Sequence, residues 1–198
     1  MEAPSVRAGS DGMNLPNQLT VLRLVLTFPF VFALSVNFPG AKLLALVIFI
    51  VGSATDYADG YIARRFNLIT DFGKLMDPLV DKIMTISAFI CLVSLRTLPA
   101  WAVIIIVSRE FLITGLRLIA AARGKVLPAE RLGKHKTVWQ IVTILYCLLL
   151  VAVDPRLDPR LSAFLHVTAF ILICFTVSLT LWSGISYFAK NWDLIREQ

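Results

Sequence analysis

The sequence predicts an all-α integral membrane protein with six transmembrane helices and both termini in the cytoplasm. Three observations lead to this fold class. Of the 198 residues, 58% are hydrophobic, the apolar residues are grouped in runs of about 20, and the basic residues concentrate between alternate runs. The mean hydropathy of +0.78 is high for a soluble domain of this size. Helices are expected because they satisfy their own backbone groups in lipid, and no alternating strand pattern appears.

Six apolar spans follow one another along the chain, at about residues 19–36, 41–62, 77–96, 99–121, 135–153 and 161–188. Asn17 is placed to cap the first helix. Proline, glycine and Asp–Pro steps mark the three turns expected outside the cell, at Pro39–Gly40, Pro99, 154–155 and 158–159. Residues 1–13 are expected to form a flexible tail, and 14–198 a single six-helix domain.

The net charge of +6 is explained by topology. With six spans, fifteen of the nineteen Lys and Arg residues fall on the side that holds both termini, which identifies that side as the cytoplasm. No segment combines aromatic and basic residues in the manner of a nucleic-acid-binding surface, so no nucleic acid is expected as a partner. Cys91, Cys147 and Cys174 lie in apolar spans without metal-type spacing and are expected to be small buried hydrophobes.

Four aspartates stand where two of the spans approach the cytoplasm. Asp56 and Asp59 end the second span, and Asp77 and Asp81 begin the third. Each pair has helical spacing and so shares one helix face, and the short link between the spans makes the two helices antiparallel neighbours. Because ionised acids at membrane depth are costly unless paired or coordinated, we expect the carboxylates to bind hard divalent cations, Mg²⁺, Mn²⁺ or Ca²⁺, and not zinc.

Small residues and one arginine accompany the acids. Gly60 follows Asp56 by four residues and Gly73 precedes Asp77 by four, which leaves room for a ligand near the backbone. Ala63 is small and belongs to the same side, and Arg64 offers a planar cation suited to a phosphate. An isolated aspartate in a membrane helix is often a packing or proton-relay residue, but this combination favours a ligand site.

These residues resemble the signature of the CDP-alcohol phosphotransferases, D-x-x-D-G-x-x-A-R followed by G-x-x-x-D-x-x-x-D. All eight positions match, at Asp56, Asp59, Gly60, Ala63, Arg64, Gly73, Asp77 and Asp81. The resemblance implies two Mg²⁺ (or Mn²⁺) ions in each active site, CDP-diacylglycerol as the donor, a homodimer, and a bacterial-type cytoplasmic membrane with the active site facing the cytoplasm.

The resemblance also implies roles for individual residues. Asp56, Asp59 and Asp77 would be the principal metal ligands, and Asp81 would complete the second metal site and act as the general base. Arg64 would hold the diphosphate. The residues implied to border the cytidine are Thr55, Asp59, Gly60, Ala63 and Gly73.

The acceptor pocket is predicted from basic residues at membrane depth. Arg109 and Arg117 in the fourth span could face one cavity, with Glu110 in line to orient Arg117. Lys134, Lys136 and Thr137 open the fifth span. Because buried cations need an anionic partner, we expect a phosphorylated alcohol as acceptor, either glycerol 3-phosphate or inositol phosphate. The alternative for the two lysines is that they extend to water or lipid headgroups.

The outer motifs, at 14–20 with Arg23 and at the basic positions above, resemble the glycerol 3-phosphate branch of the family. That branch implies formation of phosphatidylglycerol phosphate and CMP at the membrane lipid surface. Three alternatives stay open: the same chemistry with inositol phosphate or another alcohol, a divalent-cation transporter, and a non-catalytic lipid-binding protein. A transporter would place acids near the bilayer midplane in two related halves, and here they lie at one membrane end.

Overall fold

The computed structural model describes residues 15–66, 71–122, 131–154 and 157–191. Inside these ranges, the side chains of 15–17, 56–66, 71–78, 81, 122, 131–132 and 134 lie outside the description. The described chain forms six helices: α1 Leu15–Ser35, α2 Ala41–Phe66, α3 Asp71–Ser94, α4 Ala100–Ala122, α5 Arg131–Val153 and α6 Pro159–Lys190. The all-helical prediction is confirmed. The third helix begins at Asp71 instead of residue 77, because the apolar pattern reports only the part of a helix that lipid surrounds.

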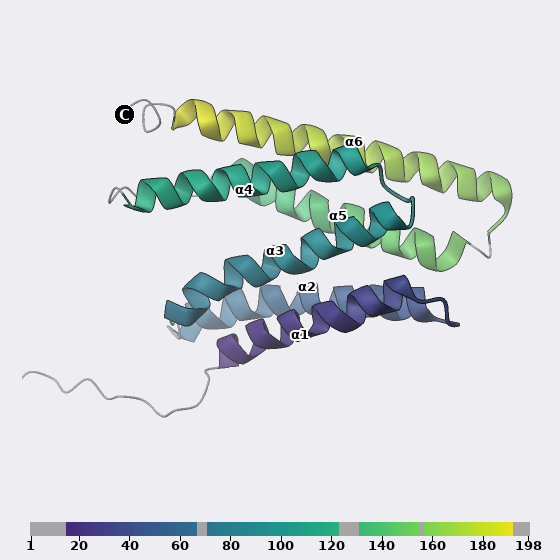
Figure 1. The fold of residues 1–198 in the computed structure, drawn as a ribbon, viewed down its shortest axis with the longest axis horizontal. Coiled ribbons are helices and arrows are strands. Elements are labelled where there is room, and N and C mark those ends of the chain that lie inside the picture. The colour runs from purple at the N-terminus through teal and green to yellow at the C-terminus, as the bar shows by residue number, and fades with distance from the viewer. Residues whose placement is uncertain (1–14, 67–70, 123–130, 155–156, 192–198) are drawn as a thin grey trace, which may run out of the picture.

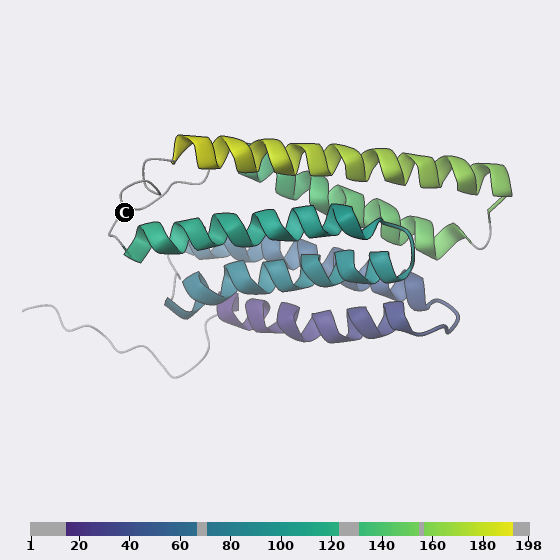
Figure 2. The ribbon, with the colours of Figure 1, turned by 45° about the horizontal axis from the view of Figure 1, so that its top comes forward.

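The helices lie side by side along one long axis (Figures 1 and 2). α1 packs against α2 and α3, and α5 packs against α2 and α6, while α4 contacts α6 and α3. Successive helices alternate in direction, so the end of α2, the start of α3, the end of α4 and the end of α6 lie at the same end of the bundle (Figure 1). We call this the signature end, because the acidic motif falls there.

Apolar side chains fill the interior and also cover the outside. Phe30, Phe49, Phe89, Ile144 and Ile173 belong to the buried core. Segments long and apolar enough to cross a membrane are Gln18–Ser35, His135–Val153 and Pro159–Lys190, and the described parts of α2 and α3 add the shorter apolar stretches Ala41–Thr55 and Lys82–Ser94. Together with the exposed apolar outer surface, these segments indicate a membrane protein.

α6 has two contrasting sides. Its buried side carries the small or hydroxylated residues Thr176, Thr180, Ser183 and Gly184 together with Ile173, Val177 and Tyr187, whereas bulky side chains such as Trp182 are exposed. Small residues let membrane helices approach closely, and the Thr176 and Thr143 hydroxyls are hydrogen-bonded at 2.8 Å between α6 and α5.

The turn between α5 and α6 is held by two aspartates. Asp158 caps α6 by accepting a hydrogen bond from the Arg160 backbone N–H at 2.8 Å. Asp154 accepts a hydrogen bond from the Ser162 hydroxyl, and its Oδ2 lies 3.6 Å from His166 Nε2. The Ser162 hydrogen bond, helped by His166, lowers the pKa of Asp154.

Candidate active site

The side chain of Met84 on α3 lies against Gly52 on α2, next to the acidic motif. A Cβ added to Gly52 on α2 would lie 2.5 Å from Met84 Cε and 2.6 Å from Met84 Sδ on α3. Met84 is buried, and the end of its side chain fills the space that a side chain at position 52 would need. Arg23 on α1 is also buried and lines, with these two residues, a cavity of about 20 Å³, which has room for one water molecule.

The eight signature residues lie in helices that the structure describes, but their side chains lie outside the described part. The last turns of α2 carry Asp56, Asp59, Gly60, Ala63 and Arg64, and the first turns of α3 carry Gly73, Asp77 and Asp81. Thr55 is described: its hydroxyl donates to the Val51 carbonyl of the same helix at 2.7 Å.

A largely buried ionic cluster joins α4 to α5. Glu110 Oε1 on α4 lies 3.4 Å from Arg109 Nη1 and forms a second ion pair with Lys136 Nζ on α5. The three side chains are only 5–16% exposed, and buried charges require such pairing. Lys136 therefore reaches α4, and the alternative that it extends to water is wrong. Lys134 lies outside the described side chains.

Arg117 is held by α6 and not by Glu110. Its Nε donates a hydrogen bond to the Tyr187 hydroxyl at 3.1 Å, and its guanidinium carbon lies 5.5 Å from the centre of the Tyr187 ring. The expected pairing of Glu110 with Arg117 is wrong, because residues seven apart in a helix are separated by about 10.5 Å along the axis, whereas Arg109 and Lys136 lie close to Glu110.

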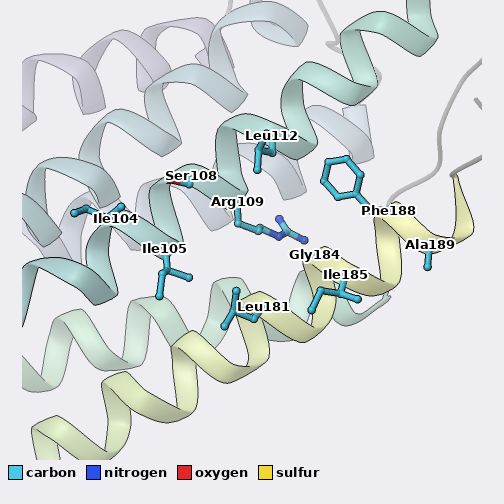
Figure 3. A pocket seen from close by; sticks show the side chains of 10 residues that line it. All are labelled: Ile104, Ile105, Ser108, Arg109, Leu112, Leu181, Gly184, Ile185, Phe188 and Ala189. Atoms are coloured by element: carbon cyan, nitrogen blue, oxygen red, sulfur yellow. The ribbon is translucent and has the colours of Figure 1, made fainter. Parts of the chain in front are cut away.

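Arg109 also contacts α6. Its Nη2 donates to the Ser183 hydroxyl at 3.2 Å, and a Cβ added to Gly184 would lie 3.1 Å from Arg109 Cγ. Figure 3 shows the Arg109 side chain extending from α4 toward Gly184 in a groove of about 550 Å³ between the two helices. Apart from Arg109 and Ser108, the lining is apolar, with Leu181 on α6 among the contributors.

Further contacts link the helix of Asp81 to this cluster. Lys82, the next residue on α3, donates from its Nζ to the Thr114 hydroxyl on α4, and Thr114 donates to the Glu110 carbonyl at 2.7 Å. Thr137 donates to the Gly133 carbonyl within α5 at 3.2 Å. Of the residues predicted for the acceptor pocket, the structure thus brings Arg109 and Lys136 together through Glu110, while Arg117 pairs with Tyr187.

Comparison with known sequences decides the family. Residues 13–185 match the sequence profile of the CDP-alcohol phosphatidyltransferases. The chain belongs to this family. It is 40% identical over 195 residues to a CDP-diacylglycerol–glycerol-3-phosphate 3-phosphatidyltransferase of Bacillus subtilis, covering 92% of this chain and 97% of the relative. A protein of Rickettsia bellii with the same name is 34% identical over 88% of this chain and 93% of its own. A "Probable phosphatidylglycerophosphate synthase" of Mycobacterium tuberculosis is 38% identical over 89% and 81%.

In this CDP-alcohol phosphatidyltransferase, the residues that sequence reasoning missed lie on α6. Ser183, Gly184 and Tyr187 contact the two arginines of α4. The only signal in the sequence was a group of small and polar residues in the otherwise apolar span 161–188, which is common at helix contacts in membranes.

Proposed function

We propose that the protein transfers the phosphatidyl group of CDP-diacylglycerol to sn-glycerol 3-phosphate, giving phosphatidylglycerol phosphate and CMP. Relatives with the corresponding name, similar over most of their length, support the reaction. The structural observation that carries the choice of a phosphorylated acceptor is the buried cluster of Arg109, Glu110 and Lys136.

We further propose that all six helices cross a bacterial cytoplasmic membrane, with both termini and the signature end at the cytoplasm. The distribution of Lys and Arg supports this orientation. α4 carries Arg109, Glu110 and Arg117. Their side chains contact α5 and α6 inside the bundle, as is usual for charged residues in membrane helices. Resemblance to the family supports a homodimer.

The metal site is proposed at Asp56, Asp59, Asp77 and Asp81. Their carboxylates form the all-oxygen donor set that Mg²⁺ or Mn²⁺ prefers. Asp56 follows Gly52 by one helical turn, and Asp81 precedes Met84 by three residues, so helical spacing puts the acids on the helix faces that carry Gly52 and Met84. Two ions bound there would neutralise charge on the donor diphosphate and on the departing CMP.

The side chains of the protein have separate tasks in this proposal. Asp81 accepts the proton of the acceptor hydroxyl, whose oxygen forms a bond to the phosphatidyl phosphorus while the bond from that phosphorus to CMP breaks. Arg64 holds the diphosphate. The residues proposed to border the cytidine are Thr55, Asp59, Gly60, Ala63 and Gly73.

The acceptor phosphate is proposed to bind at Arg109 and Lys136, with Arg117, Lys134 and Thr137 nearby. Glu110 fixes two cations from facing helices before any substrate arrives. A phosphate within reach of both would form charge-assisted hydrogen bonds, which are roughly twice as strong as neutral ones. Serine and choline carry no phosphate and could not form these hydrogen bonds.

An acceptor panel tests the proposal. Purified protein in mixed micelles receives CDP-diacylglycerol and Mg²⁺ together with glycerol 3-phosphate, inositol phosphate, glycerol or serine, and released CMP is measured. We expect CMP only with glycerol 3-phosphate. Equal release with inositol phosphate would favour the alternative acceptor. Donor binding without CMP release would favour a lipid-binding protein, and metal uptake into vesicles without lipid turnover would favour a transporter.

A further inference from the structure

One face of α6 holds both arginines of α4. Ser183 and Gly184 contact Arg109, and Tyr187, one turn further along, contacts Arg117. Ser183, Gly184 and Tyr187 are all buried. They lie more than 60 residues from the arginines in sequence, and none of them belongs to the acidic motif.

We propose that Ser183, Gly184 and Tyr187 are positioning residues that orient Arg109 and Arg117 toward the acceptor phosphate. The inference rests on the proposed function, because it takes the two arginines as acceptor ligands. Ser183, Gly184 and Tyr187 do not contact the substrate in this account. Together with Glu110, which pairs with Arg109, they restrict where the two guanidinium groups lie before the substrate binds.

The geometry around Arg109 restricts the guanidinium from two directions. The Ser183 hydroxyl donates its own proton to the Thr180 carbonyl at 3.0 Å, which turns the lone pairs of its oxygen outward to accept from Arg109 Nη2. Gly184 leaves room for the stem of Arg109, since a Cβ there would lie 3.1 Å from Cγ and 3.8 Å from Nε. Figure 3 shows the guanidinium next to Gly184.

Tyr187 restricts Arg117 in a similar way. Its hydroxyl accepts from Arg117 Nε and its ring lies beneath the guanidinium, so one residue provides both a hydrogen bond and a cation–π contact. An arginine side chain has many rotamers, and ordering it on binding costs conformational entropy. If α6 already orders the side chain in the free protein, binding does not have to supply that cost. Pre-ordering by α6 should therefore increase affinity for the acceptor more than affinity for the donor.

The test compares three variants with matched controls in the full-length protein. Ser183→Ala, Gly184→Ala and Tyr187→Phe are paired with Ser178→Ala, Gly115→Ala and Tyr146→Phe. Ser178 is exposed and its hydroxyl bonds within α6, a Cβ at Gly115 meets nothing within 4 Å, and the Tyr146 hydroxyl bonds to the Leu165 carbonyl. The measurements are the KM for each substrate, kcat and Tm.

The three variants should raise the KM for glycerol 3-phosphate about 10-fold, as expected when a charged hydrogen bond is lost or displaced. The KM for CDP-diacylglycerol should change less than about 2-fold, and the controls should resemble wild type. In an Arg109→Lys background, Ser183→Ala should have little further effect, because its partner has already changed. Equal increases in both KM values, or additive effects in that background, would overturn the inference.

Direct binding separates this inference from the proposed reaction. The dissociation constant for radiolabelled glycerol 3-phosphate is measured by equilibrium dialysis with the same proteins. Wild type that binds glycerol 3-phosphate but releases no CMP would reject the reaction, while weaker binding by the three variants would still support the positioning role. Absence of binding by wild type, or unchanged binding by the variants, would overturn the role.

Discussion

Met84 on α3 lies in the space that a side chain at Gly52 on α2 would need, with Met84 Cε only 2.5 Å from the position of a Gly52 Cβ. The contact links α2 to α3 one turn before Asp56. Because the two helices carry all four signature aspartates, we expect a change at this contact to affect catalysis more directly than a change of packing elsewhere in the bundle.

Substitution of Gly52 should therefore impair activity, and a larger side chain should impair it more. Gly52→Ala can be absorbed in part, because the displaced atoms are the flexible end of Met84. Gly52→Leu must displace the buried side chain of Met84, and we expect kcat to fall more than about 10-fold and stability to fall by about 1–3 kcal/mol. Gly115→Leu adds the same volume in open space and is the control. Wild-type CMP release and Tm in Gly52→Leu would show that neither catalysis nor stability depends on this contact.

Glu110→Gln should destabilise the protein. The change removes the carboxylate that pairs with Arg109 and Lys136, and removal of one partner from a buried ion pair costs about 3 kcal/mol. Lys136→Met in the Glu110→Gln background should recover part of the loss in Tm. If the effects of the two substitutions on stability simply add, Glu110 and Lys136 are not energetically coupled, and the ion pair does not stabilise the fold.

Asp81→Asn tests the general base. The amide cannot accept the hydroxyl proton, so kcat should fall roughly 10²–10⁴-fold, while the dissociation constant for CDP-diacylglycerol should change much less. Asp71→Asn, at the start of the same helix but outside the signature, is the matched control. Full turnover by Asp81→Asn would remove Asp81 from the mechanism.

Removal of divalent cations should abolish CMP release. EDTA treatment followed by dialysis leaves the proposed carboxylate site without cations, and Mg²⁺ or Mn²⁺ should restore activity while Zn²⁺ should not, since the donor set is all oxygen. CMP release is followed as each metal is added back. Activity that survives complete chelation would contradict the metal site.

The α5–α6 turn should give a small pH dependence to stability. The pKa of Asp154 is lowered in the folded protein, so its ionised form stabilises the fold above its unfolded pKa of about 4. This stabilisation is lost as the pH falls through the folded pKa. Asp154 is 36% exposed, so Asp154→Asn should cost less than about 1 kcal/mol at pH 7.

The Tm difference between Asp154→Asn and wild type should shrink as the pH falls below about 4. Asp158→Asn keeps a capping side chain and should leave Tm at pH 7 unchanged. A Tm difference between Asp154→Asn and wild type that increases as the pH falls would contradict a stabilising role of the ionised Asp154.

Much of the fold could be predicted from the sequence, because apolar runs report helices in lipid directly. The start of α3 could not be predicted from the apolar run, because the helix begins at Asp71, before that run starts. The acidic motif is predictable because its residues have fixed spacing within two helices, and the helical repeat puts residues at that spacing on one face. The structure does not describe its side chains, so the proposed metal geometry stays a prediction.

The neighbours of the arginines could not be predicted in the same way. Helical periodicity relates residues of one helix, and it suggested Glu110 as the partner of Arg117. The actual contact, to Tyr187, depends on how α4 and α6 pack. Nothing in the pattern of one helix specifies which residue of a distant helix will face it, and Ser183 contacts Arg109 for the same reason.

The two contrasting sides of α6 limit how that helix can turn about its own axis. A rotation by one residue, about 100°, would carry Thr180 and Ser183 toward hydrocarbon and force bulky side chains such as Trp182 inward, and both changes are unfavourable. The distribution of side chains between the buried and exposed sides of α6 thus fixes the rotation of this helix about its axis. The direction of Arg109 depends on that rotation, and therefore on residues that lie far from any reacting atom.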